Sequence, residues 1–526
     1  MPRFPARAGR CLLLSLLVAQ SAWSADTPPE PVFPIKRFAV AGNSLIPERE
    51  VEERLATHAG EGRRFADVEA ARQALLALFA ARGYHTVQVV LPEQEVSAGV
   101  VRLEVVEARL GNVRLIGALH HDAANVRASV PALLEGATPN TGEIADSLRL
   151  ANENPSKQTH LLYRPGVRAG EIDAVLRVQD ERPWKAYLAL DNTGSDGTGD
   201  ARLALGFQHS NLANRDHVLT LQYVTSPTHV DDVTILGAGY RIPLYASGDA
   251  LDFYGGYSDV DSGTVEGLFN ISGRGRILGG RYTHHFHKVS PLEHKISASL
   301  DYRAYLNDID YLGTPIGADV TVHPVSLTYS GEWTGRGRRT GYYLAVLRNL
   351  PGGDSGGEAD FAAARAGAEA DYALARLGAS HTHDIGVDWQ LRLALDAQYT
   401  GVPLVPGEQF GLGGHDSVRG FGERAVSGDR GWRASLELFG PDLGNRVGLP
   451  DARLRLSAFV EGGQARRLEP QPGESAEAGV ASAGLGLRFG LGKTLSARLD
   501  YGHVLDGGAD RQAGEGRLHA SLAYLY

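Results

Sequence analysis

Apolar and polar residues alternate at every second position over much of the C-terminal two thirds of the chain. In residues 296–306, Ile296, Ala298, Leu300, Tyr302, Ala304 and Leu306 share one parity. Residues 389–399 alternate in the same way, and so do residues 219–224, 454–460, 485–489, 495–501 and 518–526. A period of two is that of a β-strand with one apolar face and one polar face. Because turn-rich segments such as residues 191–200, 351–357 and 470–479 separate these stretches, residues 184–526 predict an antiparallel all-β region.

Two all-β architectures produce this alternation. A soluble β-sandwich places its apolar parity in a core, whereas an outer-membrane barrel turns it toward lipid. Aromatic residues recur near the ends of the alternating stretches, as in the girdles of such barrels: Tyr302, Trp389, Tyr399, Tyr501, Tyr524 and Tyr526. The polar parity also carries many charges. We therefore expect residues 184–526 to form a closed transmembrane barrel of about 16 antiparallel strands, which leaves no strand edge unpaired in hydrocarbon.

A different pattern precedes the barrel. Residues 33–107 predict the order β-α-α-β-β, with strands at 35–40, 87–91 and 100–106 and helices at 47–56 and 65–82. Residues 108–181 repeat this order, with strands at 110–116, 159–163 and 171–178 and helices at 123–134 and 141–151. A tandem α+β module of this kind is typical of binding, because an exposed strand edge can accept an extended peptide by β-augmentation. The alternative is that the two units only act as spacers.

The start of the chain is typical of a secretory signal peptide, residues 1–24, with Arg3, Arg7 and Arg10 ahead of an apolar run and a cleavage site before Ala25. Beyond it there is no run of about 18 apolar residues, so ordinary membrane-spanning helices are not expected. The single cysteine, Cys11, lies in the signal, which excludes a disulfide framework. With a net charge of −10 and no basic stripe, the chain is not expected to bind nucleic acid.

Residues 409–432 interrupt the alternation with a glycine-rich stretch that contains Val418-Arg419-Gly420-Phe421. An arginine on a long flexible loop, late in a barrel, predicts a loop packed inside the pore. A charge confined there is costly without a counter-charge. Glu437, on the stretch that follows the loop, is an inward-facing candidate. The plainer interpretation is that the lumenal charges are solvated independently of one another.

The order of signal, two β-α-α-β-β units, barrel, late Val-Arg-Gly-Phe loop and terminal aromatic residue resembles the outer-membrane transporters of two-partner secretion, within the Omp85 superfamily. The resemblance covers essentially the whole mature chain. The units at 33–107 and 108–181 look like periplasmic POTRA domains, and Val418, Arg419, Gly420 and Phe421 match the signature of a loop that folds back into the barrel. Many members also carry a plug helix before the first POTRA domain, for which the few residues between the predicted cleavage site and Phe33 leave no room.

The resemblance also implies partners for the loop and for the chain end. The family pairs the loop arginine with the acid of a Phe-x-Asp motif, and the matching segment is Phe459-Val460-Glu461, with glutamate in place of aspartate. Glu461 shares its parity with charged residues, which indicates the lumenal face, and its longer side chain is expected to reach Arg419. Tyr526, with Tyr524, would end the signal read by the barrel-assembly machinery, or would be a girdle residue.

The implied function is export of a large partner exoprotein, such as an adhesin, a haemolysin or a contact-dependent toxin, without nucleotide hydrolysis. No enzyme activity and no cofactor are implied, and the expected partners are an exoprotein with an N-terminal secretion domain, the barrel-assembly machinery and outer-membrane lipid. Two other functions stay open: an Omp85-type insertase of outer-membrane proteins, and a passive porin or receptor. His284, His285 and His287 lack a cysteine or acidic neighbour in sequence, so a metal site is not expected.

Overall fold

The computed structural model describes residues 31–96, 98–195, 197–260, 274–288, 291–306, 310–311, 314–315, 318–508 and 510–526. The predicted signal peptide, residues 1–24, lies outside them. The described residues form two compact units, one of residues 31–81 and 87–107 and one of residues 82–86 and 108–526. The second α+β repeat and the barrel therefore belong to one unit. Among the described helices, none combines the length and the apolar character needed to cross a bilayer.

The first unit contains the expected β-α-α-β-β order, formed by β2, α1, α2, β4 and β5, together with two further short strands, β1 and β3. A three-stranded sheet has the order β2-β5-β4, in which β2 pairs with β5 in parallel and β4 pairs with β5 in the antiparallel sense. Val68, Ala71, Leu75 and Phe79 form the buried face of α2, because they recur with the helical period. A short strand, β3, that the sequence pattern did not predict pairs with β1. The elements are β1 (Phe33–Ile35), β2 (Arg37–Ala41), α1 (Glu48–Ala56), β3 (Gly60–Arg63), α2 (Phe65–Ala81), β4 (Gln88–Val90) and β5 (Val100–Val106).

The second unit begins with the repeat of this fold, a sheet of order β6-β8-β7. Its elements are β6 (Arg109–Ile116), α3 (Ala123–Ala128), α4 (Thr141–Ala151), β7 (Lys157–Pro165) and β8 (Glu171–Asp180). The helix predicted at residues 123–134 ends at Ala128, so that prediction was too long. Pro131 explains the end, because a proline disfavours the helical conformation of the preceding residue, Val130. Asp122 and Asn140 cap the two helices by accepting hydrogen bonds from backbone N–H groups of the first turns.

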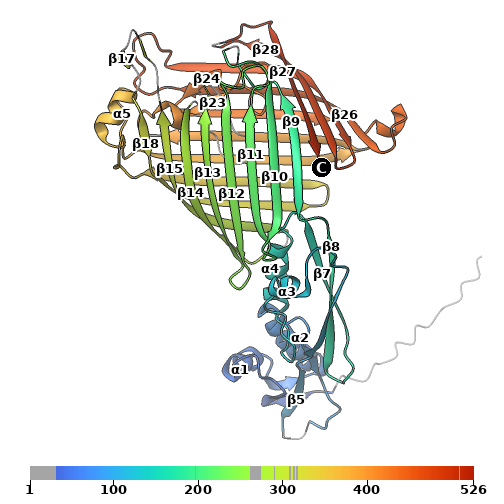
Figure 1. Cartoon of the computed structure of the whole chain (residues 1–526). Helices are drawn as coiled ribbons and strands as arrows, with labels where there is room; N and C mark the ends of the chain where they lie inside the picture. Colours follow the sequence, from blue (N-terminus) through green and yellow to red (C-terminus); the bar gives the residue numbers. More distant parts are fainter. Residues whose placement is uncertain are drawn as a thin grey trace, which may run out of the picture. The chain divides into compact units, whose positions relative to one another are not determined.

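The rest of the second unit is a closed antiparallel barrel (Figure 1) with sixteen long strands among the described residues, as the alternation predicted. Short β18 (Val320–Val322) adds to one pairing, and β29 pairs with β9 to close the ring. The long strands are β9 (Trp184–Asp191), β10 (Arg202–Leu212), β11 (His217–Thr225), β12 (Thr234–Leu244), β13 (Asp249–Asp259), β14 (Arg274–His285), β15 (Leu292–Leu306), β19 (Pro324–Gly335), β20 (Arg338–Asn349), β21 (Ala373–Gly386), β22 (Trp389–Thr400), β25 (Arg430–Phe439), β26 (Ala452–Arg466), β27 (Glu477–Leu491), β28 (Leu495–Asp506) and β29 (Gly516–Leu525).

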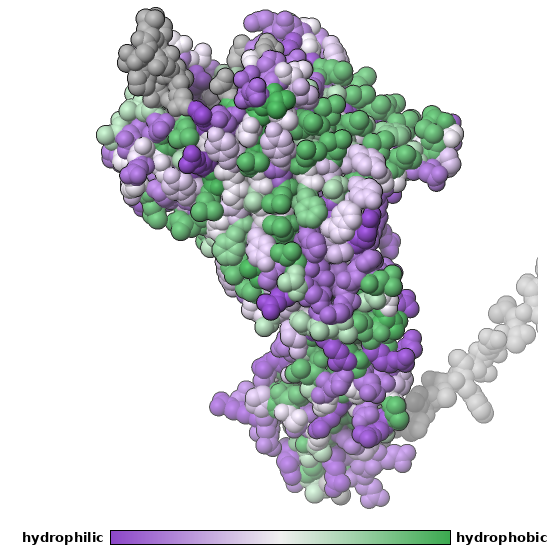
Figure 2. Space-filling model, in the orientation of Figure 1, coloured by the Kyte–Doolittle hydropathy of each residue, from purple (hydrophilic) through white to green (hydrophobic). Residues whose placement is uncertain are grey.

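The two faces of the barrel wall differ in polarity. Large apolar side chains on one parity stay exposed on the outside, among them Leu278 at 65% and Leu485 at 69% exposure. Figure 2 shows apolar side chains gathered on the visible barrel wall, whereas the α/β domains carry mostly hydrophilic ones. Outward apolar residues alternating with inward polar residues are the pattern of a barrel in lipid.

A buried polar cluster joins the second α/β repeat to the turn between β10 and β11. Lys157, on β7, is 1% exposed and pairs with Asp216 of that turn. Asn125 donates from Nδ2 to Asp216 Oδ1 at 3.0 Å, and Tyr245 donates from its hydroxyl to Asp216 Oδ2 at 2.7 Å. His121 Nε2 lies 3.6 Å from Asp216 Oδ1. The buried Asp216 carboxylate is thus neutralised by Lys157 only while the second α/β repeat contacts the turn between β10 and β11.

Candidate functional site: the lumenal loop

The loop of interest runs from residue 401 to residue 429, between β22 and β25. It starts before the predicted boundary at 409 and ends before 432, because residues 430–432 already belong to β25. Instead of a featureless flexible segment it forms an antiparallel hairpin, β23 (Phe410–Leu412) with β24 (Val426–Gly428). Gly413 and Gly414 follow β23 with φ angles of 102° and 109°, which only glycine adopts without strain. The glycines therefore specify a turn.

Two residues of the motif attach the loop to the barrel wall by packing. Val418 and Phe421 are 1% and 0% exposed. They belong to an apolar cluster that includes Ala465, Val480 and Val504 from β26, β27 and β28. Apolar burial of this extent stabilises each large side chain by about 1.5–3 kcal/mol. The loop is consequently seated on the wall.

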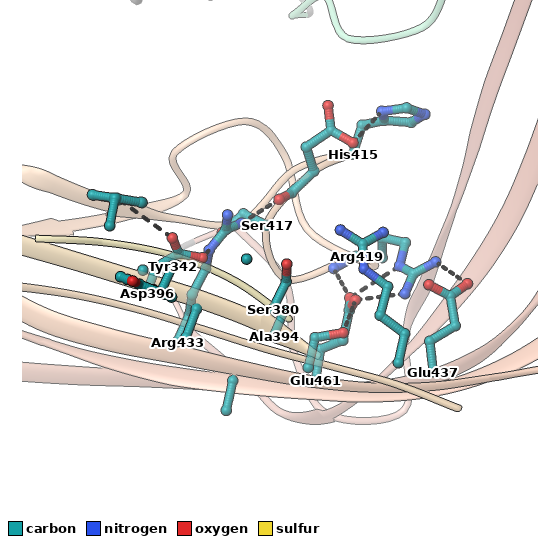
Figure 3. Close-up of a pocket in the computed structure, with 18 of the residues that line it drawn as sticks. Tyr342, Ser380, Ala394, Asp396, His415, Ser417, Arg419, Arg433, Glu437 and Glu461 are labelled. Atoms are coloured by element: carbon teal, nitrogen blue, oxygen red, sulfur yellow. Dashed lines mark hydrogen bonds and ion pairs between the residues drawn. The ribbon is translucent and has the colours of Figure 1, made fainter. Parts of the chain in front are cut away.

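Arg419 lies between these two residues in sequence, and its side chain reaches Glu461, its predicted partner (Figure 3). Arg419 Nε donates to Glu461 Oε2 at 3.0 Å and Nη2 donates to Oε1 at 2.5 Å, so the pair is bidentate. The Arg419 backbone N–H donates to the same Oε2 at 2.9 Å. Phe459, the other residue of the matched motif, lies under the guanidinium, with its ring centroid 3.4 Å from Cζ. Glutamate in place of aspartate thus reaches both the side chain and the backbone of the loop.

Two more carboxylates complete the surroundings of Arg419. Nη1 donates to Glu437 Oε1 at 3.2 Å and to Asp500 Oδ1 at 3.1 Å. Arg488 contacts the same two acids, at 3.0 Å from Glu437 and 2.7 Å from Asp500, and Arg498 Nε donates to Asp500 Oδ2 at 2.6 Å. With Glu461 included, three carboxylates face three guanidinium groups. This charge balance is what makes burial of the ions tolerable.

Asp500 is fully buried and was not among the predicted site residues. A signal for it exists in the alternation, since Leu499 and Tyr501 face outward and Asp500 must therefore face the lumen. What the sequence does not contain is the register that brings β28 next to the tip of the loop.

Gly420 and Gly502 allow the loop backbone to approach the wall closely. The Gly420 N–H donates to His519 Nε2, on β29, at 3.0 Å. Gly420 has a φ of 101°, which favours glycine. A Cβ atom on Gly502 would lie 2.5 Å from the Gly420 nitrogen, so a side chain there would push the loop away. Glycine at 502 is required by the space available.

The base of the loop has a second ionic anchor that the sequence reasoning missed. Glu408 is fully buried and accepts hydrogen bonds from Arg303 Nη1 at 2.8 Å, from Arg376 Nη2 at 3.3 Å and from the Tyr305 hydroxyl at 2.7 Å. Burial acts to raise the pKa of Glu408, but the guanidinium groups of Arg303 and Arg376 outweigh it and hold that pKa below its usual range. Glu408 is therefore ionised at neutral pH.

Asp429 holds the other side of the loop base. Its carboxylate accepts hydrogen bonds from the Leu404 N–H at 2.9 Å, from Gln409 Nε2 at 3.1 Å and from the Leu468 N–H at 2.7 Å. Arg365 pairs with it at 3.2 Å. The loop is thus fixed at both ends and at its tip.

A polar cavity of about 670 Å³ lies beside the seated tip. Its wall includes Tyr342, Ser380, Arg392, Asp396 and Arg433, from four different strands, together with Arg419. Arg433 Nε donates to Asp396 Oδ2 at 2.9 Å (Figure 3). The lumen next to the loop is therefore lined by paired charges and hydroxyl groups, which suits a hydrated path.

The two C-terminal tyrosines lie apart from this site. The Tyr526 N–H donates to the Ala186 carbonyl at 2.8 Å, which extends the pairing of β29 with β9. Its ring lies 5.7 Å from that of Trp184, and Arg182 stacks on both rings. Tyr524 and Tyr526 are 46% and 58% exposed. Both positions match a girdle at the end of the barrel.

The three neighbouring histidines do not converge. His284 contacts Asp249 at 2.7 Å, His285 contacts Glu153 at 3.1 Å and His287 contacts Asp146 at 2.6 Å. These three carboxylates come from distant parts of the sequence, so the absence of an acidic neighbour in sequence did not reveal them. Within the described ranges no group of three or more side chains has the arrangement of a metal site.

Comparison with known proteins shows the family of the chain. The model of the haemolysin secretion/activation protein family ShlB/FhaC/HecB matches residues 170–489. The chain belongs to this family. A model of the ShlB-type POTRA domain matches residues 33–108. As a member of the family, the protein is an outer-membrane transporter of the Omp85 superfamily with its POTRA domains in the periplasm.

Individual relatives agree with this membership. The chain is 25% identical to the outer membrane transporter CdiB of Escherichia coli over 479 residues, which is 88% of this chain and 77% of the relative. It is 24% identical to the heme/hemopexin transporter protein HuxB of Haemophilus influenzae strain 86-028NP over 216 residues, 40% of this chain and 37% of HuxB.

Solved structures share the fold. CdiB from Escherichia coli superposes with a TM-score of 0.75 at 20% identity, covering 97% of this chain and 93% of CdiB. BamA from Haemophilus ducreyi, in a form lacking POTRA domains 1–3, gives a TM-score of 0.52 at 15% identity, covering 94% of this chain and all of that one.

Proposed function

We propose that this transporter exports one large exoprotein across the outer membrane, and that export is driven without nucleotide hydrolysis. The seat of Arg419 on Glu461, Glu437 and Asp500 carries the proposal, because a loop fixed inside the lumen by buried ions is a part that a passive channel does not need. Membership of the secretion/activation family supports it. In this proposal the protein is no enzyme and takes no cofactor.

The POTRA domains are the receptor in this proposal. The sheets β2-β5-β4 and β6-β8-β7 each have edge strands, β4 and β7 among them. An unfolded segment that adds to such an edge gains main-chain hydrogen bonds with little dependence on its side chains. Binding of this kind is weak and reversible, as a receptor must be if it is to release its client into the pore. The client is an exoprotein with an N-terminal secretion domain, of adhesin, haemolysin or contact-dependent toxin type.

Two further contacts belong to the same proposal. Tyr526, with Tyr524, ends the segment that the barrel-assembly machinery reads during insertion. The outward apolar parity of the strands contacts outer-membrane lipid. The exposed rings of both tyrosines and the exposed leucines of the barrel wall support these roles.

A comparison of culture media from strains with and without the gene tests the function. We expect a single large protein to disappear from the medium and to return when the gene is restored. Loss of many barrel proteins from the outer membrane would instead identify an insertase. Loss of small-solute uptake with an unchanged set of secreted proteins would identify a porin.

A further inference from the structure

A groove of about 420 Å³ lies on the wall of the barrel near the strand ends that flank the lumenal loop. Its outward-facing lining is Leu344, Ala375, Leu377, Ala397, Tyr399, Arg430, Trp432, Gln464, Arg466 and Glu477. We call it the rim groove. Tyr399 and Trp432 are 62% and 46% exposed and share the outward parity of their strands.

The strand directions place the rim groove at the outer leaflet. β9 directly follows the second α/β repeat in the chain, and the POTRA domains are periplasmic; successive long strands run antiparallel. β22 therefore ends, and β25 begins, on the extracellular side. Tyr399 is the last but one residue of β22 and Arg430 is the first residue of β25. The groove consequently faces the headgroup level of the outer leaflet.

The rim groove has two layers that match the two parts of a lipid. In the layer farther from the strand ends, Leu377 pairs in register with Ala397, Ala397 with Trp432, and Trp432 with Gln464. In the layer at the ends, Ala375 pairs with Tyr399, Arg430 pairs with Arg466, and Arg466 pairs in turn with Glu477. A mainly apolar layer toward the membrane centre and, at its surface, a layer in which two arginines outnumber one glutamate suit an acyl chain below an anionic headgroup.

The two arginines lie directly opposite each other on adjacent strands. Like charges in that position destabilise a sheet unless an anion lies between them. Arg466 has one weak carboxylate contact, to Glu477 at 3.6 Å, in which both side chains are more than half exposed. The arrangement therefore has a surplus of positive charge on a face that is otherwise apolar.

The Arg430 side chain is held in place by two contacts, which leave its terminal nitrogens able to donate hydrogen bonds to a ligand. Its Nε donates to the Thr400 carbonyl at 2.5 Å, and its Cζ lies 4.4 Å from the centroid of the Tyr399 ring. For its two terminal nitrogens there is no acceptor among the described residues of the groove. A guanidinium fixed by stacking, with free donors, is well suited to bind phosphate. An ordinary aromatic girdle accounts for Tyr399 and Trp432 but not for this paired cationic layer.

We propose that the rim groove binds the phosphate group of a phosphorylated glycolipid of the outer leaflet, with Arg430 and Arg466 as the phosphate ligands and Trp432 and Leu377 against an acyl chain. The proposal depends on the position of the barrel in the outer membrane. It does not depend on which protein is exported, or on whether any is.

The test uses the full-length protein in detergent and purified lipopolysaccharide as the probe, with binding followed by native mass spectrometry. Arg430→Gln/Arg466→Gln should weaken binding at least about tenfold, since it removes both phosphate ligands. Arg466→Gln alone, which leaves the contact of Arg430 with Thr400, should give an intermediate loss. Arg336→Gln/Arg338→Gln removes two positive charges at the periplasmic rim and should leave binding unchanged. Heat-modifiable migration on gels verifies that each barrel is folded.

Two further arms separate the sources of phosphate. Enzymatically dephosphorylated lipopolysaccharide should bind the wild type as weakly as the intact lipid binds the double variant. Inorganic phosphate at millimolar concentration should compete poorly, because it lacks the acyl chain. Equal binding of intact lipid by wild type and folded double variant, or displacement by inorganic phosphate alone, would overturn the proposal.

Discussion

Arg419 and Glu461 form a buried bidentate ion pair, with Nη2 and Oε1 2.5 Å apart and exposures of only 2% and 5% for the two residues. One acid would be enough to neutralise the loop arginine. Here Glu437 and Asp500 contact it as well. Arg488 pairs with both of these acids, and Arg498 pairs with Asp500. Because Arg419, Glu437 and Asp500 each contact at least two oppositely charged groups, the loss of one leaves the rest unbalanced.

Arg419→Ala should lower secretion strongly while the barrel still assembles. The substitution leaves three buried carboxylates facing two guanidinium groups, and removal of one member of a buried ion pair costs about 3–5 kcal/mol. The cost falls on the seat of the loop and not on the strand ladder. The measurements are exoprotein in the medium and heat-modifiable migration of the barrel; normal secretion by a folded variant would refute the role of Arg419.

Gly502→Ala should displace the loop without touching any charge. The added Cβ would lie 2.5 Å from the Gly420 nitrogen, and the hydrogen bond from that N–H to His519 could not persist. Gly490→Ala is the matched control, since a Cβ on that barrel glycine meets no atom within 4 Å. We expect faster proteolysis of residues 413–425 in the first variant only. Identical cleavage rates in both would show that close approach at Gly502 is unimportant.

Glu408→Gln should loosen the base of the loop. It removes the buried carboxylate that Arg303 and Arg376 share, and loss of one member of a buried ion pair lowers the free energy of unfolding by about 3–5 kcal/mol. Glu332→Gln breaks an exposed pair with Arg339 and should have little effect. Single-channel recordings in planar bilayers should show more frequent current fluctuations for Glu408→Gln; steady currents like those of the control would argue against an anchoring role.

Lys157→Met should open the contact between the second POTRA domain and the turn after β10, because it leaves Asp216 buried with no cation bonded to it. Adding Asp216→Asn removes the unpaired charge, so the double variant should recover most of the protection. Asparagine also tolerates the φ of 59° at this position. Hydrogen–deuterium exchange of residues 120–128 and 208–217 measures the effect. If the double variant exchanges as fast as Lys157→Met in these residues, the contact depends on the ion pair itself and not on avoiding an unpaired Asp216 carboxylate.

Deletion of residues 33–107 should abolish binding of the client's secretion domain and leave ion conductance intact. The deletion removes the sheet that contains β4, whereas the ring of strand pairings from β9 to β29 lies wholly in the other unit. Pull-down with the secretion domain of the client tests binding, and bilayer recordings test the pore. Undiminished binding would identify the first POTRA domain as a spacer.

Features that depend on local pattern could be predicted from the sequence. The alternation at residues 389–399 gave the outward and inward faces of β22, because side-chain direction in a strand follows from parity alone. The same parity placed Glu461 in the lumen, and the motif placed Arg419 on the loop that meets it. The prediction of a helix over residues 123–134 was too long, although Pro131 is a local signal for an earlier end.

Features that depend on register could not be predicted. Asp500 is 81 residues from Arg419 in sequence, and Glu408 meets Arg303 over a separation of 105 residues. Which inward acid meets which arginine is set by the stagger of strands around the closed ring, and a single sequence does not contain that stagger. The rim groove is of the same kind, since Arg430 and Arg466 meet only in the paired strands.

The contacts of the loop tip also fix an order of events during biogenesis. Arg419 and Gly420 bind residues of β25, β26, β28 and β29, and β29 follows the other three strands in the chain. The complete set of contacts therefore exists only after the C-terminal strand has been translated and has reached its neighbours. A loop bound at all of these contacts therefore indicates that the strands on this side of the barrel have paired. In a barrel that lacks β29, Arg419 would not be held in its complete set of contacts.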